Sequence, residues 1–331
     1  MIKVLIVGGY TIHGMLANLL KGFEKIGCDV QHLPYMGQHE IPQNLKEKLL
    51  EYQPDFISAF IPERWNKDMS VRLINDCEVP THFYDFDMPQ ESLRNDRCWL
   101  QTIASAFTFA TSTDDSKMTK DFFEPTGIPL HWMPPIYESE DKPNIVQRTI
   151  DITILGNGYS SGNYSGNQYE LHNRTETAFE LRKEFGHENV NLVGEGWPGG
   201  WSKGPCFYYE QFDIYAKTKI NIGTMIAVPP GKSRALNFRP TLTLGSGSFL
   251  LQEWHEGIDD CFTDGEEIVY WKTYEELLDK CSYYLQNEQE RERIAFNGAT
   301  AVQTRYSNTK WAAKLLEIAN VISPAEETIE A

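Results

Sequence analysis

Residues 233–295 read SRALNFRPTLTLGSGSFLLQEWHEGIDDCFTDGEEIVYWKTYEELLDKCSYYLQNEQERERIA, and this stretch decides the fold class. It opens with a polar, cationic turn and passes a Gly/Ser break at 245–248 before a short apolar strand at 249–251. An acidic loop leads to a second short strand at 268–271 and then to two charged amphipathic helices. This order is typical of the last third of a nucleotide-binding α/β domain, in which phosphate-binding groups lie at the start of a helix.

The residues before this stretch show the same alternation of strands and helices. A strand at 151–155 is followed by a loop rich in Gly, Asn and Ser, and a helix is predicted at 175–185. Further strands are predicted at 190–193 and 220–222. The second half of the chain is therefore an α/β domain over 151–305.

The first half repeats the pattern on its own. Its predicted strands and apolar runs are 2–7, 29–33, 55–60, 81–84 and 106–110, and its predicted helices are 16–26, 43–52 and 67–76. Short apolar runs that alternate with helices predict a doubly wound parallel sheet. This first domain covers 1–137, and the prolines and charges of 138–150 predict an exposed linker.

Two Rossmann-like domains, each with a glycine-rich turn after its first strand, are expected to face each other across a cleft. Ligands of such sheets bind at the carboxyl ends of the strands. The layout therefore favours a transferase with two substrates.

Composition excludes several classes of protein. The chain has 331 residues and a formal net charge of −17, which argues against broad binding of nucleic acid but leaves room for a local basic cleft. No run of about 18 apolar residues exists, so we expect no membrane span. The N-terminus enters a strand at once, without the layout of a secretory signal, which predicts a cytoplasmic protein. The six cysteines show no CxxC spacing, so neither a zinc site nor a disulfide framework is predicted.

The first glycine-rich turn contains Gly8, Gly9 and Gly14 directly after the first strand. Glycines there let backbone N–H groups approach an anion, and a turn without a ligand is the alternative. The spacing does not fit G-x-G-x-x-G, so a nicotinamide enzyme is disfavoured. His13 lies in the same loop and is a candidate general base or phosphate contact, as well as an ordinary histidine.

The second glycine-rich loop contains Gly156, Gly158 and Tyr159. Its backbone and hydroxyl groups are suited to hold a diphosphate, with the charge of Arg174 at the start of the next helix. A mobile loop is the alternative. Trp197 follows the strand at 190–193, where its indole either contacts a nucleobase or serves the structure.

The cationic turn that opens the deciding stretch comprises Lys232, Ser233, Arg234, Asn237 and Arg239. Residues 230–233 (PGKS) resemble the end of a P-loop, but Ile226 replaces the required earlier glycine, so a P-loop is rejected. Cations before a helix in so acidic a chain still predict contact with anionic groups of a ligand.

The motif Asp85-Phe86-Asp87 has the D-x-D form that binds a divalent metal in single-domain glycosyltransferases. Here it lies deep in the first domain, where two close acids more often coat a loop. We therefore predict no metal site and retain Asp87 as a candidate carboxylate of the cleft.

The segments together resemble the two-domain GT-B glycosyltransferases, and within them the group-1 branch that includes spore-maturation-type proteins. The resemblance covers most of the chain. In the first half it rests on PTHFYDFDMP, AFTFATSTDDS and GIPLHWMPP, and in the second half on DITILGNG, NLVGEGW and NIG. It is most specific in RPTLTLGSGSFLL with GIDDCF, DGEEIVYW, YEELLDKCSYYL and ERERIA.

The resemblance implies transfer of a hexosyl or pentosyl group from a nucleotide-sugar donor, without a metal or other cofactor. The second domain would hold the donor, and Gly8 and Gly9 would face its diphosphate from the acceptor side. A helix within 306–322 would pack back on the first domain, followed by a tail at 323–331. The acceptor is a DNA base, a glycan or a protein.

Arg239 matches the arginine of the family's R-x-x-E segment, but Leu242 stands where the family places an acid that binds the donor ribose. This departure motivates an alternative function. In that alternative, the chain is a non-catalytic nucleotide-sugar-binding protein or the partner subunit of a glycosyltransferase.

Overall fold

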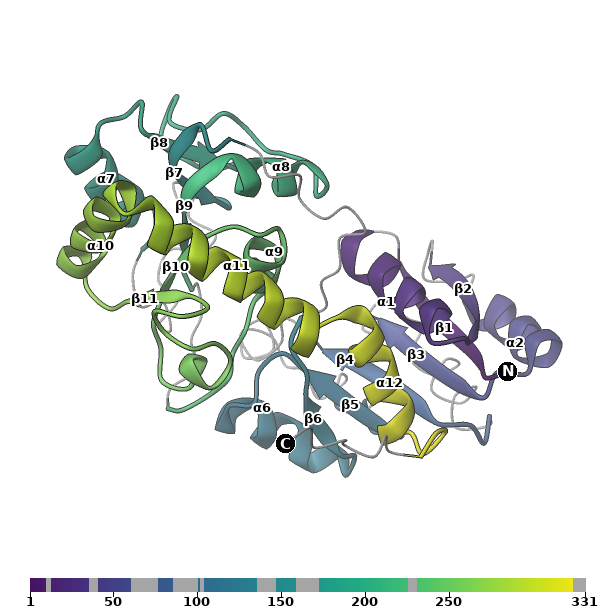
Figure 1. The fold of residues 1–331 in the computed structure, drawn as a ribbon. Coiled ribbons are helices and arrows are strands. Elements are labelled where there is room, and N and C mark those ends of the chain that lie inside the picture. The colour runs from purple at the N-terminus through teal and green to yellow at the C-terminus, as the bar shows by residue number, and fades with distance from the viewer. Residues whose placement is uncertain are drawn as a thin grey trace. The chain divides into compact units, whose positions relative to one another are not determined.

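The computed structural model describes residues 1–9, 13–35, 41–60, 77–85, 101, 104–135, 147–158, 173–225 and 231–323. The chain divides into two compact units (Figure 1). Unit 1 comprises Met1–Ile136 together with Ser307–Ala331, and unit 2 comprises Tyr137–Tyr306. The last helix of the chain is therefore part of the first unit.

Unit 1 is built on a parallel sheet with the strand order β2-β1-β3-β4-β5-β6. Its described strands are β1 (Lys3–Gly9), β2 (Asp29–Tyr35), β3 (Phe56–Phe60), β4 (Thr81–Asp85), β5 (Phe109–Ser112) and β6 (Leu130–Trp132). The order reverses direction at β1, because β2 lies on one side of it and β3 to β6 on the other. This is the topology of a doubly wound sheet.

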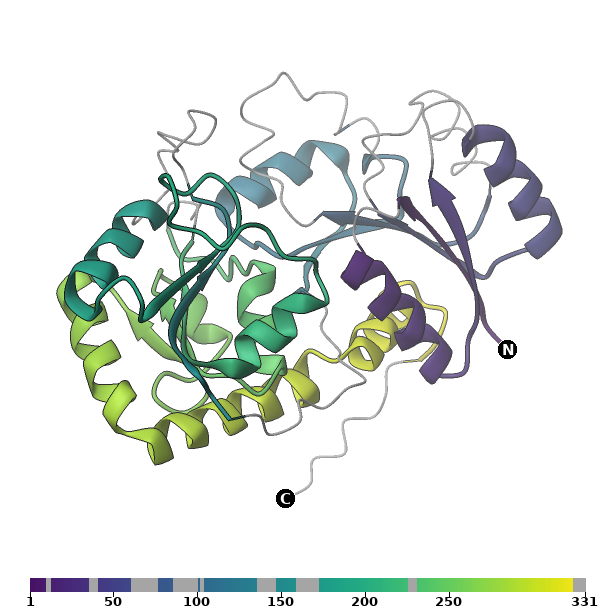
Figure 2. The same ribbon diagram turned by 90° about the horizontal axis from the view of Figure 1, so that it is seen from above.

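The described helices of unit 1 are α1 (His13–Lys25), α2 (Ile41–Tyr52), α6 (Lys117–Phe123) and α12 (Asn308–Ile318). Helix α12 packs beside α1, although the two lie at opposite ends of the chain (Figures 1 and 2). The side-chain amide of Asn308 donates to the carbonyl oxygen of Asn18 at 3.0 Å. The indole of Trp311 donates to the carbonyl oxygen of Pro134 at 2.7 Å.

Unit 2 contains a second parallel sheet, with the order β11-β10-β9-β7-β8. Its described strands are β7 (Ile150–Leu155), β8 (Val190–Val193), β9 (Thr218–Gly223), β10 (Leu250–Glu253) and β11 (Val269–Trp271). Strand β9 is central, so the loops after β7, β9 and β10 meet at the middle of the carboxyl edge.

Helices cover both faces of this sheet. The described helices of unit 2 are α7 (Arg174–Phe185), α8 (Glu210–Lys217), α9 (Phe238–Gly245), α10 (Tyr274–Gln286) and α11 (Glu288–Arg305). Helices α7 and α10 lie on one face, and α8 and α9 on the other (Figure 2). The core between the sheet and α7 and α10 consists of buried apolar side chains such as Ile154, Leu181, Phe249 and Leu277.

The predicted fold class is confirmed, because both halves form parallel sheets with flanking helices. The predicted helix at 67–76 lies outside the described residues. Helices α6 and α8 were not predicted. Each is only seven or eight residues long, so neither contains enough turns to show a helical apolar pattern.

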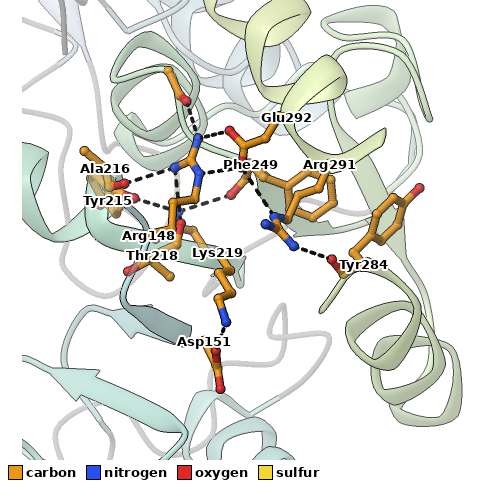
Figure 3. Close-up of polar contacts among 12 residues, drawn as sticks. Arg148, Asp151, Tyr215, Ala216, Thr218, Lys219, Phe249, Tyr284, Arg291 and Glu292 are labelled. Atoms are coloured by element: carbon orange, nitrogen blue, oxygen red, sulfur yellow. Dashed lines mark hydrogen bonds and ion pairs between the residues drawn. The ribbon is translucent and has the colours of Figure 1, made fainter. Parts of the chain in front are cut away.

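Arg148, two residues before β7, forms hydrogen bonds that hold the segment before β7 at the amino edge of the sheet of unit 2 (Figure 3). Its Nε and Nη2 atoms donate to the two carboxylate oxygens of Glu292 on α11 at 2.6 and 2.7 Å. The same guanidinium donates to the carbonyl oxygens of Gly247, Ala216 and Thr218 at 2.9, 3.1 and 3.3 Å. One side chain thus joins four segments, and residues that the sequence assigns to the linker are bonded to unit 2.

A polar group is buried within the sheet of unit 1. His82 on β4 is fully buried between Ser58 on β3 and Thr111 on β5. Its Nδ1 atom lies 2.8 Å from the Ser58 hydroxyl, and its Nε2 atom lies 2.7 Å from the Thr111 hydroxyl. Burial lowers the pKa of His82 to about 3, so the ring is neutral in the folded chain.

Candidate functional site

At the carboxyl edge of the sheet of unit 2, the loop after β7 (residues 156–158) is hydrogen-bonded to the loop after β8 (residues 194–196). The N–H of Gly158 donates to the carbonyl oxygen of Glu195 at 2.8 Å, and the N–H of Glu195 donates to the Asn157 side chain at 2.9 Å. At Gly194, with φ of +128°, a Cβ would overlap the backbone of Gly156. Glycine is required there because two backbones approach closely.

Trp197 supports these loops from the core. Its indole donates to the carbonyl oxygen of Gly156 at 3.0 Å, and its ring lies against Gly158. The side chain is 7% exposed and belongs to the hydrophobic core of unit 2. Of the two readings that the sequence leaves open for this residue, the geometry favours the structural one.

Two arginines meet at Gly156, directly after β7. A Cβ placed on Gly156 would lie 2.9 Å from Nη1 of Arg174 and 2.9 Å from Nη2 of Arg239. Arg174 begins α7 and is buried, whereas Arg239 lies in the first turn of α9 and is half-buried. Two positive charges therefore flank one glycine at the carboxyl edge.

Both guanidinium groups are held by the backbone at strand ends. Arg239 donates through Nε to the carbonyl oxygen of Leu155 at 3.0 Å and through Nη1 to that of Thr224 at 3.1 Å. Arg174 donates through Nε to the Thr224 hydroxyl at 2.9 Å and through Nη1 to the carbonyl oxygen of Asn157 at 2.7 Å. Among the described residues, Nε and Nη1 of Arg239 have acceptors and Nη2 has none.

Residues 224 and 225, after the central strand β9, are bound from several sides. Besides the two arginines, the fully buried Glu253 at the end of β10 accepts the N–H of Met225 at 2.7 Å. The amide of Asn237 contacts the sulfur of Met225 at 3.2 Å. Thr224, Met225 and Glu253 were not predicted from the sequence. The available signal was their position, since each lies at or just after the carboxyl end of a strand.

Asn237 begins helix α9. Its side chain accepts the N–H of Arg239 at 2.9 Å, which makes it the N-cap residue. The positive end of the α9 dipole therefore lies beside the Arg239 charge. Both residues come from the predicted cationic turn.

The other residues of that turn lie differently. Lys232 forms an exposed ion pair with Asp260 at 2.7 Å, and this hydrogen bond raises the pKa of Lys232. Ser233 is buried, and its N–H donates to the carbonyl oxygen of Glu256 at 2.9 Å. Arg234 lies close enough to Tyr306 to oppose the increase in the pKa of Tyr306 that burial causes. Arg239 is thus joined at Gly156 by Arg174, which is remote in sequence, rather than by Lys232.

A buried tyrosine reports the electrostatic potential of this edge. Burial raises the pKa of Tyr215 on α8, while Arg239 and, more weakly, Arg174 act in the opposite direction.

In unit 1, Gly8 and Gly9 end β1 at the carboxyl edge, and the ring of His32 lies 3.1 Å from the carbonyl oxygen of Gly8. His13 begins α1. The side chain of His13, together with Tyr159 and Asp87, lies outside the described parts of the chain. Within the parts that are described, no three His, Cys, Asp or Glu side chains gather closely enough to hold a metal ion. None of the described helices is both long and apolar enough to span a membrane.

Comparison with known proteins gives a match to one family model over part of the chain, and several matches to solved structures. Residues 174–317 match the family model described as "Glycosyl transferase-like", which begins at Arg174 and includes Arg239. Comparison with curated protein sequences found no match.

Several solved structures have the same fold as this chain. HepE of Anabaena in complex with UDP and glucose aligns with a TM-score of 0.61 at 11% identity, over 97% of this chain and 100% of that one. A glycosyltransferase from Rickettsia africae gives 0.62 at 11%, over 98% and 99%. AviGT4, a glycosyltransferase of avilamycin A biosynthesis, gives 0.59 at 12%, over 97% of each chain. The predicted GT-B fold is therefore confirmed along the whole chain.

Proposed function

We propose that this chain, whose fold is GT-B and whose residues 174–317 match the glycosyl transferase-like model, moves a sugar from a nucleotide-sugar donor to an acceptor. The observation that carries the proposal is the pair of guanidinium groups at Gly156. Glycosyl transfer breaks the bond between the anomeric carbon and a diphosphate oxygen, and negative charge grows on the leaving diphosphate. Preorganised cations at that point stabilise the transition state more than the ground state.

Arg239 is the residue best placed for this role. Two of its nitrogen atoms are bound by the carbonyl oxygens of Leu155 and Thr224, so the orientation of the guanidinium is set before a ligand binds. Its remaining nitrogen, Nη2, lies beside Gly156, where the absence of a side chain leaves room for a phosphate oxygen. The N-terminus of α9 adds the partial positive charge of its dipole.

Arg174 contributes a second, buried positive charge to the same site. It is 2% exposed and ties the loop after β7 to Thr224 after β9. Because the charge lies in a buried environment next to Gly156, it is screened less by water than a surface charge. Two fixed cations supply the charge compensation that a divalent metal provides in other glycosyltransferases. Transfer without a metal is therefore part of the proposal.

The proposal also includes the finer points of the resemblance. These are the spore-maturation-like branch, which rests on the segment that begins at Arg239, and a cytoplasmic location, where nucleotide sugars are supplied. The complexes of HepE with UDP and with UDP-glucose make UDP and UDP-glucose the first donor probes to use.

Calorimetry with UDP tests the donor site. We expect Arg239→Gln to weaken UDP binding by about ten- to a hundredfold, since hydrogen bonds to charged groups contribute roughly 1.5–3 kcal/mol. Arg293→Gln is the matched control, because Arg293 is an exposed arginine of unit 2 that donates to the carbonyl oxygen of Gly265. Equal UDP affinity in the wild type and Arg239→Gln, or failure of UDP, GDP and ADP alike to bind the wild type, would refute the proposal.

Leu242 favours a second candidate function. This residue of α9 is 4% exposed, so an apolar side chain packs where the family places its ribose-binding acid. In this second function, the chain binds a nucleotide sugar without transferring the sugar. Release of nucleoside diphosphate from bound nucleotide sugars distinguishes the two functions, because a non-catalytic protein binds the donor and releases none above the background rate.

A further inference from the structure

Two aromatic side chains are exposed side by side on unit 2, outside the site at Gly156. Phe207 is 67% exposed and Tyr209 is 69% exposed. Their ring centroids lie 5.7 Å apart, and the ring planes differ by only 6°. Contiguous exposed aromatic surface is unfavourable in water and commonly marks a binding site. We refer to these two rings as the aromatic pair.

The turn that carries the aromatic pair is anchored. Tyr208 lies between Phe207 and Tyr209 in the sequence, and its hydroxyl is buried. The centroid of its ring lies 5.4 Å from that of Phe212, and the two rings meet edge to face. The N–H of Phe207 donates to the Glu210 carboxylate at 2.7 Å, and the N–H of Glu210 donates to the carbonyl oxygen of Phe207 at 3.0 Å. The rings are therefore presented by a closed turn, so a ligand meets a surface that is already formed.

The aromatic pair lies at the carboxyl edge of the sheet, as the donor site does. It immediately precedes α8, which ends at Lys217 directly before β9 begins at Thr218. Because β9 begins at the amino edge of the sheet, α8 must begin at the carboxyl edge.

The charges beside the aromatic pair restrict its ligand. The first turn of α8 carries two acids: Glu210, which accepts the N–H of Phe207, and Asp213, which forms an ion pair with Lys217 at 3.7 Å. Carboxylates repel phosphates and uronic acids, so nucleic acid and anionic glycans are disfavoured. They accept hydrogen bonds from hydroxyl groups. Flat apolar rings next to hydroxyl acceptors match a neutral sugar, whose C–H face packs on aromatic rings while its hydroxyl groups point outward.

We propose that the aromatic pair of Phe207 and Tyr209 is a binding site for a neutral carbohydrate chain, which holds the acceptor near the donor. The inference rests on the proposed glycosyltransferase function and narrows its acceptor to a glycan. The carbohydrate binds here by stacking on the rings and through its hydroxyl groups, which donate hydrogen bonds to the acids of α8. The sugar units that stack are not the unit that reacts, because the diphosphate site is formed by other residues.

Saturation-transfer NMR and native gels that contain polysaccharide test this site. The probes are maltohexaose, cellohexaose and dextran as neutral saccharides, and a twelve-nucleotide single-stranded DNA. The variants are Phe207→Ser with Tyr209→Ser and, as a matched control, Phe296→Ser, since Phe296 is 71% exposed on α11 of the same unit. UDP affinity and the melting temperature are measured for every variant.

We expect the wild type to bind at least one neutral saccharide. The double variant should bind it about tenfold more weakly, since it lacks both rings on which the sugar stacks. The Phe296 variant should retain saccharide affinity, and all variants should retain UDP affinity. The inference is overturned by a wild type that binds none of the saccharides, by unchanged binding in the double variant, or by DNA binding that depends on the aromatic pair. Failure of the wild type to bind UDP, GDP and ADP alike would instead refute the proposed function.

Discussion

The guanidinium groups of Arg174 and Arg239 both reach Gly156, and each lies closer to it than a Cβ at that position would allow. Neither group is free to move aside. Arg174 is bonded to Asn157 and Thr224, and Arg239 is bonded to Leu155 and Thr224. The space at Gly156 is therefore maintained by hydrogen bonds at the carboxyl ends of two strands, β7 and β9.

Gly156→Ala is predicted to impair donor binding. The new methyl group would lie 2.9 Å from a nitrogen of each arginine and would displace both guanidinium groups or fill the space for a phosphate oxygen. We expect UDP affinity to fall about tenfold or more by calorimetry. Gly199→Ala is the control, because nothing lies within 4 Å of a Cβ at Gly199. Unchanged UDP affinity in Gly156→Ala would show that phosphate does not bind at this point.

The fold could be predicted from the sequence because strands and helices are encoded locally. The apolar runs at 2–7, 151–155 and 249–251 largely coincide with the strands β1, β7 and β10. The site could be predicted only as separate pieces. Gly156, Arg174 and Arg239 were each candidates, but their meeting depends on the strand order, which places the loop after β7 next to that after β9.

The same dependence on topology explains why the sequence alone could not assign Lys232 and Trp197 either to a ligand or to the structure. A lysine in an acidic chain indicates an anionic ligand, yet the carboxylate that pairs with Lys232 comes from Asp260 on another loop. An indole after a strand fits a nucleobase equally well until Gly158 is seen to pack against its ring. Tertiary contacts of this kind are not visible in local sequence.

Arg148→Ala is predicted to destabilise unit 2. The change removes a bidentate bond to Glu292 and leaves three carbonyl oxygens without their donor (Figure 3). We expect the free energy of unfolding to fall by about 2–4 kcal/mol, because the Arg148 side chain is mostly buried. Lys183→Ala should change it by less than about 0.5 kcal/mol, since Lys183 and Glu180 form a surface pair at 3.5 Å. Urea unfolding measures both, and equal effects would contradict the proposed importance of Arg148.

Gly22→Ala is predicted to loosen α12 from α1. A Cβ at Gly22 would press into the backbone carbonyl of Asn308, at the start of α12. Alanine in place of a helical glycine normally stabilises by about 1 kcal/mol. We nevertheless expect the free energy of unfolding to fall by roughly 1–3 kcal/mol, because the new methyl group disturbs the contact between α1 and α12. Glu24→Ala, an exposed change in the same helix, is the control. Urea unfolding and proteolysis after Tyr306 are the measurements, and a more stable Gly22→Ala variant would rule out close packing here.

Unit 1 is predicted to lose stability as the pH falls below about 6.5, the ordinary pKa of histidine. Folded His82 has a pKa lowered by burial to about 3, so between these two values the unfolded chain binds a proton that the folded chain does not. The stability contributed by neutral His82 is complete above pH 6.5 or so and is lost as the pH falls toward 3, by about 1.4 kcal/mol per pH unit. Burial also lowers the pKa of His131, which acts in the same direction.

His82→Gln tests this pH dependence. Glutamine is neutral throughout the range and retains a donor and an acceptor for Ser58 and Thr111, the two partners of His82. Urea unfolding at pH 7.5 and pH 5.0 should show a smaller difference for this variant than for the wild type. His187→Gln, which removes an exposed histidine of unit 2, should retain the wild-type difference. If His82→Gln and the wild type lose equal stability between the two pH values, protonation of His82 does not drive the acid sensitivity of unit 1.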